Sequence, residues 1–280
     1  MVYCQQTLMN MKRIILCADD YGQNEPISQA IIALLKKNRL SATSCMTTSA
    51  SWSLHASWLS DFRDAADIGL HFNLTIGKPL SQALLNSHGF MSLPKLIIYS
   101  YSGILNRAAI TEELHSQLDH FEKALGCLPD FVDGHQHIHQ LPMIRDVLLN
   151  VYKERLQQQG SYIRCAYDVK PFSMKGKMIE LLGAGALKKT LLKRKISHNS
   201  SFSGIYSFSE KREYPRIFQQ FLASIRDRGM IMCHPGLAPI YDADVIATAR
   251  FEEYRYFESE QFLLDCAKAG AGLGRWKNIC

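Results

Sequence analysis

The chain has 280 residues, 47% of them hydrophobic and 21% charged, which is typical of a soluble globular protein with a substantial core. Its formal net charge of +6 is only mildly basic, so the composition indicates neither a nucleic-acid-binding surface nor any other particular partner. The eight cysteines are widely scattered without a CxxC pair, which argues against a disulfide framework and fits reduced, buried thiols.

The start of the chain, MVYCQQTLMNMKRIILCADD, has no basic region ahead of an apolar core, as a secretion signal would have. No later apolar run approaches the length of a membrane span. We therefore expect a cytoplasmic protein without a transmembrane segment.

Apolar, strand-like runs alternate along the chain with segments of helical periodicity. The expected strands lie at residues 13–18, 43–48, 67–74, 130–135, 162–167 and 229–234. The expected helices lie at residues 25–38, 111–126, 143–159 and 214–229, and Gly126 and Gly229 stand where helices are expected to stop. This βα alternation predicts a parallel α/β sheet, either doubly wound or closed into a barrel. Because no Pro- or Ser-rich linker divides it, we predict one domain over residues 12–280 after an N-terminal extension of residues 1–11.

Two stretches interrupt the alternation, residues 77–106 and residues 171–209. Long insertions in βα folds usually follow the C-terminal end of a strand, so both are candidate substrate loops. The second contains the basic run LKKTLLKRK at residues 187–195. A solvated helix face is the plain interpretation of this run, and an anionic substrate or a membrane surface would also suit it.

The segment FVDGHQHIHQ, residues 131–140, places three histidines at alternate positions behind an aspartate. In an extended strand His135, His137 and His139 would project to one face, whereas a strand that ends at Gly134 or His135 would splay them around a loop. Imidazole at this density indicates a metal or proton-transfer site, and the alternative is a surface histidine cluster.

Four polar clusters stand at or just past the C-terminal ends of four expected strands. They are ADDYG at 18–22, GLHFNLT at 69–75, DGHQHIH at 133–139 and CHPG at 233–236. Parallel βα folds build their active sites at this edge of the sheet, so the shared placement indicates one site. Taken singly, each cluster also has a structural interpretation, such as a helix cap or a satisfied core histidine.

One Asp and two His make an open site for a divalent metal, and such an ion polarises a carbonyl and activates water for hydrolysis. The side chains of Asp19 and Asp20 would face opposite ways in an extended segment, so we expect a turn at Tyr21–Gly22 to bring both to the site. One can then ligate the ion while the other acts as a general base. His234 or one of the clustered histidines can protonate the leaving amine.

In order and approximate spacing, the segments CADDYG, GLHFNLTIGKPL, VDGHQHIHQLP and MCHPG resemble the signature segments of the YdjC-like carbohydrate deacetylases. That family includes chitooligosaccharide and hopanoid-associated deacetylases. The resemblance runs from about residue 12 to residue 275. It implies a distorted TIM-like (β/α) barrel and metal-dependent removal of an N-acetyl group from an acetylated sugar.

The resemblance also implies roles for the matching residues. Asp19 is expected to be the general base, and His234 to stabilise or protonate on the other side of the reacting group. Asp20, His71 and His135 are expected to hold one divalent ion. Imidazole ligands favour zinc, while a site with one carboxylate and several waters also takes magnesium, so either Mg²⁺ or Zn²⁺ is expected.

Tyr21, His137 and Arg164 are expected to contact the substrate, and His139 to orient a neighbouring side chain. Gln136 stands where the chitooligosaccharide branch has a histidine, which argues against chitobiose as the substrate. The expected substrate is a small acetylated sugar or a glycolipid. We expect no nucleic-acid partner, and a homodimer is a candidate assembly.

Two other functions fit the same motifs. A metal-dependent phosphoesterase also uses HxH pairs with carboxylates, although such sites usually hold two metals and need more carboxylates. A catalytically inactive family member would only bind sugar or metal. Asp19 separates this inactive alternative from the deacetylase, because binding alone does not need a free carboxylate beside the metal.

Overall fold

The computed structural model describes residues 11–87, 89–167, 177, 180–208, 213–237 and 244–279. Within these ranges eight strands form one sheet, and every strand pair in it is parallel. The strands are β1 (Lys12–Tyr21), β2 (Ala42–Cys45), β3 (Asp67–Phe72), β4 (Phe131–Gly134), β5 (Tyr162–Ile163), β6 (Phe202–Ser203), β7 (Gly229–Cys233) and β8 (Ala271–Leu273).

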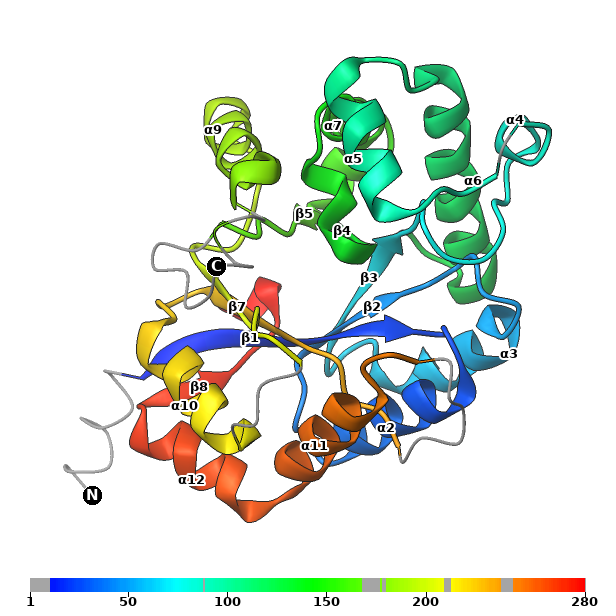
Figure 1. The fold of residues 1–280 in the computed structure, drawn as a ribbon. Coiled ribbons are helices and arrows are strands. Elements are labelled where there is room, and N and C mark those ends of the chain that lie inside the picture. Colours follow the sequence, from blue (N-terminus) through cyan, green and yellow to red (C-terminus); the bar gives the residue numbers. More distant parts are fainter. Residues whose placement is uncertain are drawn as a thin grey trace.

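The sheet follows the order β5-β4-β3-β2-β1-β7-β6, and β8 pairs with the first residues of β1. The path ends at β5 and β6, which do not pair with each other in the described part of the chain, so the curled sheet is an incomplete barrel (Figure 1). This confirms the predicted distorted (β/α) barrel in one domain. The proposed extension ahead of residue 12 falls almost wholly on residues outside the described ranges, and its boundary stays a prediction.

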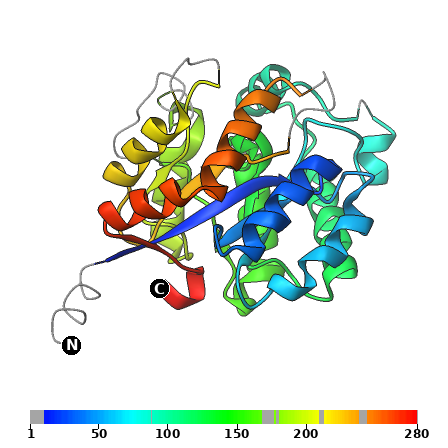
Figure 2. The same cartoon turned by 90° about the horizontal axis from the view of Figure 1, so that it is seen from below.

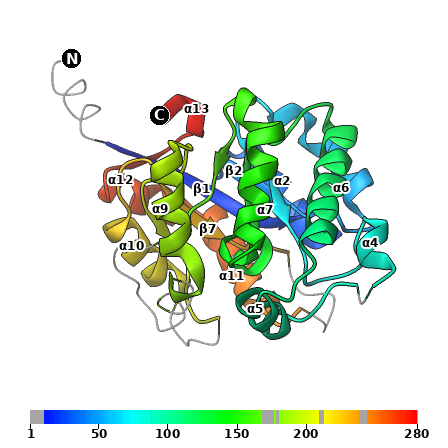
Figure 3. The ribbon, with the colours of Figure 1, turned by 90° about the horizontal axis from the view of Figure 1, so that it is seen from above.

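Helices cover the outside of the sheet. α10, α11 and α12 pack together on one side, where α11 also contacts α2, and α6 packs against α7 and β3 on the other (Figures 2 and 3). The helices are α2 (Glu25–Lys36), α3 (Trp52–Ala56), α4 (Gln82–Leu85), α5 (Leu93–Ser102), α6 (Arg107–Leu125), α7 (Ile144–Val151), α9 (Gly185–Arg194), α10 (Tyr214–Ser224), α11 (Ala247–Glu258), α12 (Glu260–Lys268) and α13 (Trp276–Ile279). The short helical turns are η1 (Ser57–Phe62), η2 (His135–Gln140), η3 (Tyr152–Leu156), η4 (Gln157–Gln159) and η5 (Glu180–Ala184).

Helix α6 shows how the sequence sets an element's limits. The side chain of Asn106 accepts a hydrogen bond from the backbone N–H of Ala109 at its start, and Gly126 ends it with a left-handed φ of 71°. The predicted stop at Gly126 is confirmed.

The predicted stop at Gly229 is wrong, because α10 ends at Ser224 and Gly229 begins β7. A Cβ at Gly229 would lie 2.5 Å from the Ser201 hydroxyl, so only a glycine leaves room for the close approach of Ser201 at this position.

Strand β1 separates two apolar clusters. Ile14 and Leu16 face the cluster beneath the helices, while Ile15 and Cys17 belong to a smaller cluster on the opposite face. This alternation continues to Asp19, which therefore lies on the same face as Cys17. The smaller cluster fills the interior beneath the carboxyl ends of the strands.

The two insertions contain regular structure that periodicity did not predict. The first includes α4 and α5, and the second includes α9 and the two-residue strand β6. The basic run forms most of α9, whose Lys189, Lys193 and Arg194 are exposed. Strand β8, three residues long, was also missed.

The described cysteines are free, and all except the partly buried Cys127 are buried, as predicted. No helix in the described residues is long and apolar enough to cross a membrane. The cytoplasmic location and the homodimer stay predictions.

Candidate active site

The four sequence motifs meet at one cavity of about 820 Å³ at the carboxyl ends of the strands. A cavity of this size lies in the upper part of the range typical of small-molecule sites. The structure brings to it the predicted catalytic and metal-binding residues, which are Asp19, Asp20, His71, His135 and His234. The edge predicted from the placement of the motifs at the ends of the strands is therefore the edge that forms the cavity.

The end of β1 brings two adjacent carboxylates to the cavity. Asp20 adopts a left-handed φ of 68°, and the register between β1 and β2 shifts between Ala18 and Tyr21. This irregularity turns the Asp20 side chain, which plain alternation would send to the other face. The expected turn at Tyr21–Gly22 is confirmed, since Gly22 has a left-handed φ of 86° and the backbone N–H of Gln23 donates to the backbone oxygen of Asp20 over 3.0 Å. The left-handed Asp20 just ahead of this turn, inside the strand, was not predicted.

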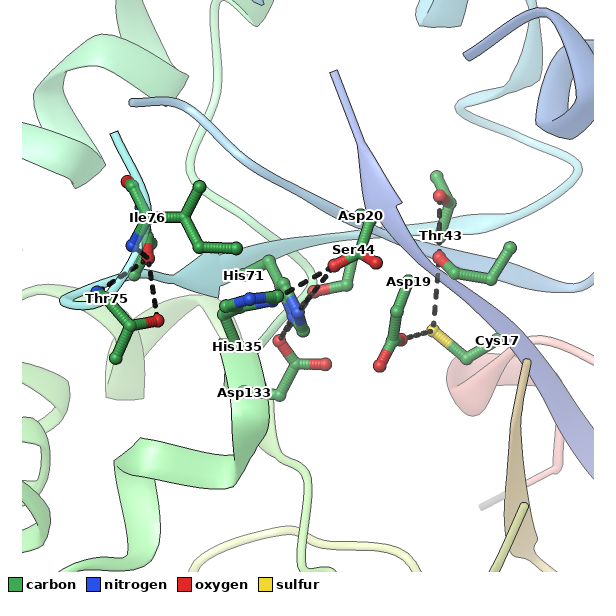
Figure 4. A network of polar contacts seen from close by, with 12 residues as sticks. Cys17, Asp19, Asp20, Thr43, Ser44, His71, Thr75, Ile76, Asp133 and His135 are labelled. Atoms are coloured by element: carbon green, nitrogen blue, oxygen red, sulfur yellow. Dashed lines mark hydrogen bonds and ion pairs between the residues drawn. The ribbon is translucent and has the colours of Figure 1, made fainter. Parts of the chain in front are cut away.

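Asp20, His71 and His135 form a compact, buried cluster (Figure 4). Oδ1 of Asp20 lies 3.1 Å from Nδ1 of His135 and 3.4 Å from Nε2 of His71. One potential ligand atom from each residue lies within 4.8 Å of the others. Burial alone would raise the pKa of Asp20, but Arg250 and the two histidines hold it well below its usual range. One ionised carboxylate and two converging imidazoles fit a divalent cation.

A buried aspartate orients His71 from behind. Oδ1 of Asp133 lies 2.7 Å from Nδ1 of His71 and accepts a hydrogen bond of 2.6 Å from the Ser44 hydroxyl (Figure 4). Burial lowers the pKa of His71, but the charge and hydrogen bond of Asp133 outweigh it and raise this pKa to about 10. Such a carboxylate typically fixes the ring and tautomer of a metal-binding histidine. This role of Asp133 was not predicted, although Asp133 stands only two residues before His135.

Arg164 holds the carboxylate of Asp19. Its Nη1 lies 2.7 Å from Oδ2 and its Nη2 lies 2.5 Å from Oδ1 of Asp19, and Nη2 is also 2.7 Å from Oδ2 of Asp133. Arg164 is fully buried and is absent from the described cavity lining. The expected substrate contact of Arg164 therefore does not match its position, which is beneath Asp19.

The expected substrate contact of Tyr21 does not match the structure either. Its side chain is fully buried, its hydroxyl donates to the backbone oxygen of His55 over 2.6 Å, and it is not among the described residues that line the cavity.

The three clustered histidines are splayed, because β4 ends at Gly134 and the chain turns sharply. Gln136 and His137 both have left-handed φ angles, 54° and 60°. His135 joins the metal-site cluster, His137 lines the cavity, and the buried His139 lies with Nε2 2.9 Å from the backbone oxygen of Arg164. Burial lowers the pKa of His139 to about 4, so this imidazole is neutral.

His234 faces the cavity from the end of β7. Burial is the main cause that lowers its pKa to about 4, and its Nδ1 is buried without a hydrogen-bond partner in the described structure. Its backbone N–H donates to Glu253 of α11, and Glu253 also accepts a hydrogen bond of 2.7 Å from the Tyr206 hydroxyl. Burial raises the pKa of Glu253 to about 7. Nothing in the sequence indicated that Glu253 lies here.

Comparison with known proteins assigns the family. The family model described as YdjC-like protein matches residues 13–268. The chain belongs to the YdjC-like family. A carbohydrate deacetylase of Danio rerio is 32% identical over 151 residues, which are 51% of this chain and 47% of that protein. A chitooligosaccharide deacetylase of Yersinia enterocolitica is 32% identical over 161 residues, 53% of this chain and 63% of that protein. The YdjC-like chain thus spans less than two thirds of either relative.

Solved structures support the fold alone, because their sequence identities are low. A protein of Enterococcus faecalis V583, provisionally named a cellobiose-phosphate cleavage protein, superposes with a TM-score of 0.74 at 19% identity, covering 97% of this chain and 100% of that one. A peptidoglycan N-acetylglucosamine deacetylase superposes with a TM-score of 0.53 at 11% identity, covering 96% of this chain and 88% of that one. Both likenesses agree with the incomplete parallel barrel of this YdjC-like protein.

Proposed function

We propose that this YdjC-like protein is a metal-dependent hydrolase that removes an N-acetyl group from an acetylated carbohydrate. The observation that carries the proposal is the convergence of Asp20, His71 and His135, with the second carboxylate of Asp19 beside them. The names of the two deacetylase relatives support the same reaction.

Asp20, His71 and His135 would hold the ion, Mg²⁺ or Zn²⁺. A bound divalent ion supplies Lewis-acid chemistry, polarising the amide carbonyl and making water more reactive near neutral pH. Asp19 accepts the proton that the attacking water loses. Arg164 binds both oxygens of Asp19, but a carboxylate offers about four lone-pair positions, so the pairing fixes its orientation and leaves it able to accept.

His234 lines the cavity just after the end of β7 as a neutral imidazole, since burial lowers its pKa to about 4. A neutral ring carries one N–H, so at neutral pH it is better suited to donate a hydrogen bond to a developing oxyanion than to deliver a proton. Asp19 then returns the proton it took from the water to the amine nitrogen as the C–N bond breaks, so the amine leaves neutral. His137, which also lines the cavity, is proposed to contact the substrate.

A phosphoesterase with two metals is disfavoured by Arg164. Asp19, His71 and Asp133 form a second group of potential ligands in the described structure. However, the guanidinium of Arg164 already pairs with both of its carboxylates, at 2.5 Å from Asp19 and 2.7 Å from Asp133. A second cation there would have to displace a buried arginine. The arrangement therefore supports one metal and amide hydrolysis.

The cavity also bears on the kind of sugar. One part of its wall is aliphatic, formed by Ile76, Leu93, Ile97, Leu141 and Leu182. Sugar hydroxyls buried against such a wall would lose hydrogen bonds to water without replacement. Val245, which is in the cavity lining, is 97% exposed, and Leu181, which precedes the lining residue Leu182 in the chain, is 82% exposed. These features favour an acetylated sugar that carries an apolar group, as a glycolipid does, over a free oligosaccharide.

The function is tested by acetate release from a panel of N-acetylated sugars by the purified protein loaded with Mg²⁺ or Zn²⁺. We expect release that stops when EDTA removes the metal, and no hydrolysis of phosphate monoesters under the same conditions. Acetate release that persists without metal, or phosphate release that exceeds it, would contradict the proposal.

The substrate class is tested with a matched pair, the methyl and hexyl glycosides of N-acetylglucosamine. Burial of each methylene contributes about 0.8 kcal/mol, so contact with two of them is expected to raise kcat/KM about tenfold for the hexyl compound. Ile97→Asn should reduce this preference, because Ile97 lines the cavity. Ile98→Asn is the control, since the adjacent Ile98 is 64% exposed and is absent from the described lining. Equal kcat/KM values for both glycosides would exclude the apolar contact.

A further inference from the structure

Arg250, on α11, reaches the metal-site cluster from a distant part of the chain. It is only 4% exposed, and its Nη2 lies 2.6 Å from Oδ2 of Asp20. Its Nε lies 2.6 Å from Oδ2 of Asp244, just before the same helix. One guanidinium therefore joins a carboxylate at the end of β1 to a carboxylate at the rim of the cavity.

The pairing divides the two oxygens of Asp20 between different partners. Oδ2 faces Arg250, while Oδ1 lies 3.1 Å from His135 and 3.4 Å from His71. The terminal torsion of an aspartate side chain is broad, so its carboxylate turns readily unless a partner fixes it. The backbone of Asp20 is itself left-handed, which sets the direction in which the side chain leaves the backbone but does not fix this last torsion.

We propose that Arg250 is a positioning residue for the metal centre, which holds Asp20 with Oδ1 toward His71 and His135. The inference rests on the proposed function only in taking these three residues as the metal ligands. Arg250 is not one of the three proposed ligands. It acts through Asp20, as a hydrogen-bonded partner typically orients a ligating side chain.

The geometry requires an arginine rather than any cation. Nε and Nη2 are fixed relative to each other in a planar group, so two carboxylates can be held at a set angle. A lysine is a point charge on a flexible stem and would fix neither the direction of Asp20 nor its link to Asp244. Asp244 holds the arginine through Nε, and Asp244 and its neighbours Val245 and Ile246 line the cavity.

The test measures metal binding directly, with Co²⁺ as the probe. We expect Arg250→Met to weaken Co²⁺ binding by about 10- to 100-fold in calorimetric titration, the usual cost of losing a partner that orients a ligand. The visible absorption spectrum of bound Co²⁺, which reports ligand geometry, should also change. Arg250→Lys should keep more of the affinity than Arg250→Met and still show an altered spectrum.

Arg275→Met is the matched control. Arg275 is also a buried arginine paired with an aspartate, 3.1 Å from Asp67, but Asp67 begins β3 and so lies at the opposite end of the strand from His71. This variant should lose stability and keep the wild-type Co²⁺ affinity and spectrum.

The outcomes separate this inference from the proposed activity. Wild-type affinity and spectrum in folded Arg250→Met would overturn the positioning role, as would equal losses in Arg250→Met and Arg275→Met. If Arg250→Met does not fold, an unchanged Co²⁺ spectrum in Arg250→Lys overturns it instead. A wild-type protein that binds Co²⁺ but releases no acetate from any sugar refutes the deacetylase function. The positioning role of Arg250 is then still decided by the Co²⁺ titrations and spectra.

Discussion

Replacing Asp19 with asparagine is expected to lower the turnover of acetylated sugar by about 10²- to 10⁴-fold, the usual range for loss of a general base. The substitution keeps the shape of the side chain and removes its ability to accept a proton. Asp20, His71 and His135 are untouched, so the variant should still bind metal. Acetate release and metal content are measured on the same preparation.

A large loss in Asp19→Asn needs a control for the buried ion pair, because Asp19 is also the bidentate partner of Arg164. Asp67→Asn supplies it, since Asp67 is buried and paired with Arg275 far from the cavity. This control should lower the melting temperature and leave the turnover of the folded protein near normal. Near-normal acetate release by metal-bound Asp19→Asn would reject the general base and move that role to His137 or His234.

The principal site residues could be predicted because parallel topology turns local patterns into a common location. Asp19, His71 and His234 each follow an apolar run, and carboxyl ends of parallel strands meet at one edge. Knowledge of the strand order was not needed for that step. The distances between the side chains do depend on the strand order, and they came only from the structure.

The supporting residues could not be predicted in the same way. Arg250 and Glu253 lie on α11, and Arg250 is 230 positions from Asp20 in the chain. Only tertiary packing brings these two residues to the site. Arg164 was expected to contact the substrate, yet its long side chain runs beneath Asp19. The left-handed backbone of Asp20 has no signal in the residue types around it.

The fold shows the same limit at the level of elements. Strands β6 and β8 are two and three residues long, too short to show a hydrophobic period, and their pairing partners define them. Gly229 was interpreted as a helix stop because it follows an amphipathic run. In the structure it is the first residue of β7, and Ser201 lies so close to it that no side chain would fit there.

Metal binding should be abolished by His71→Ala and by His135→Ala, with the fold intact. Each variant leaves one imidazole and one carboxylate, too few to hold a divalent ion firmly, and the (β/α) barrel core is formed by other residues. His139→Gln is the matched control. His139 is buried in the same segment, but it pairs with the backbone of Arg164 and not with the ligand cluster. This control should bind metal at full stoichiometry.

The pH dependence of metal binding should test whether His71 is one of the ligands. Asp133 raises the pKa of His71 to about 10 against the effect of burial, so without metal the imidazole is protonated at neutral pH. A protonated imidazole cannot ligate, and each ion bound must displace this proton. Below pH 10 the apparent affinity should therefore rise about tenfold per pH unit. Calorimetry in buffers of different ionisation enthalpy should count about one proton released per ion. Full metal stoichiometry in both alanine variants, or binding without proton release, would refute this ligand set.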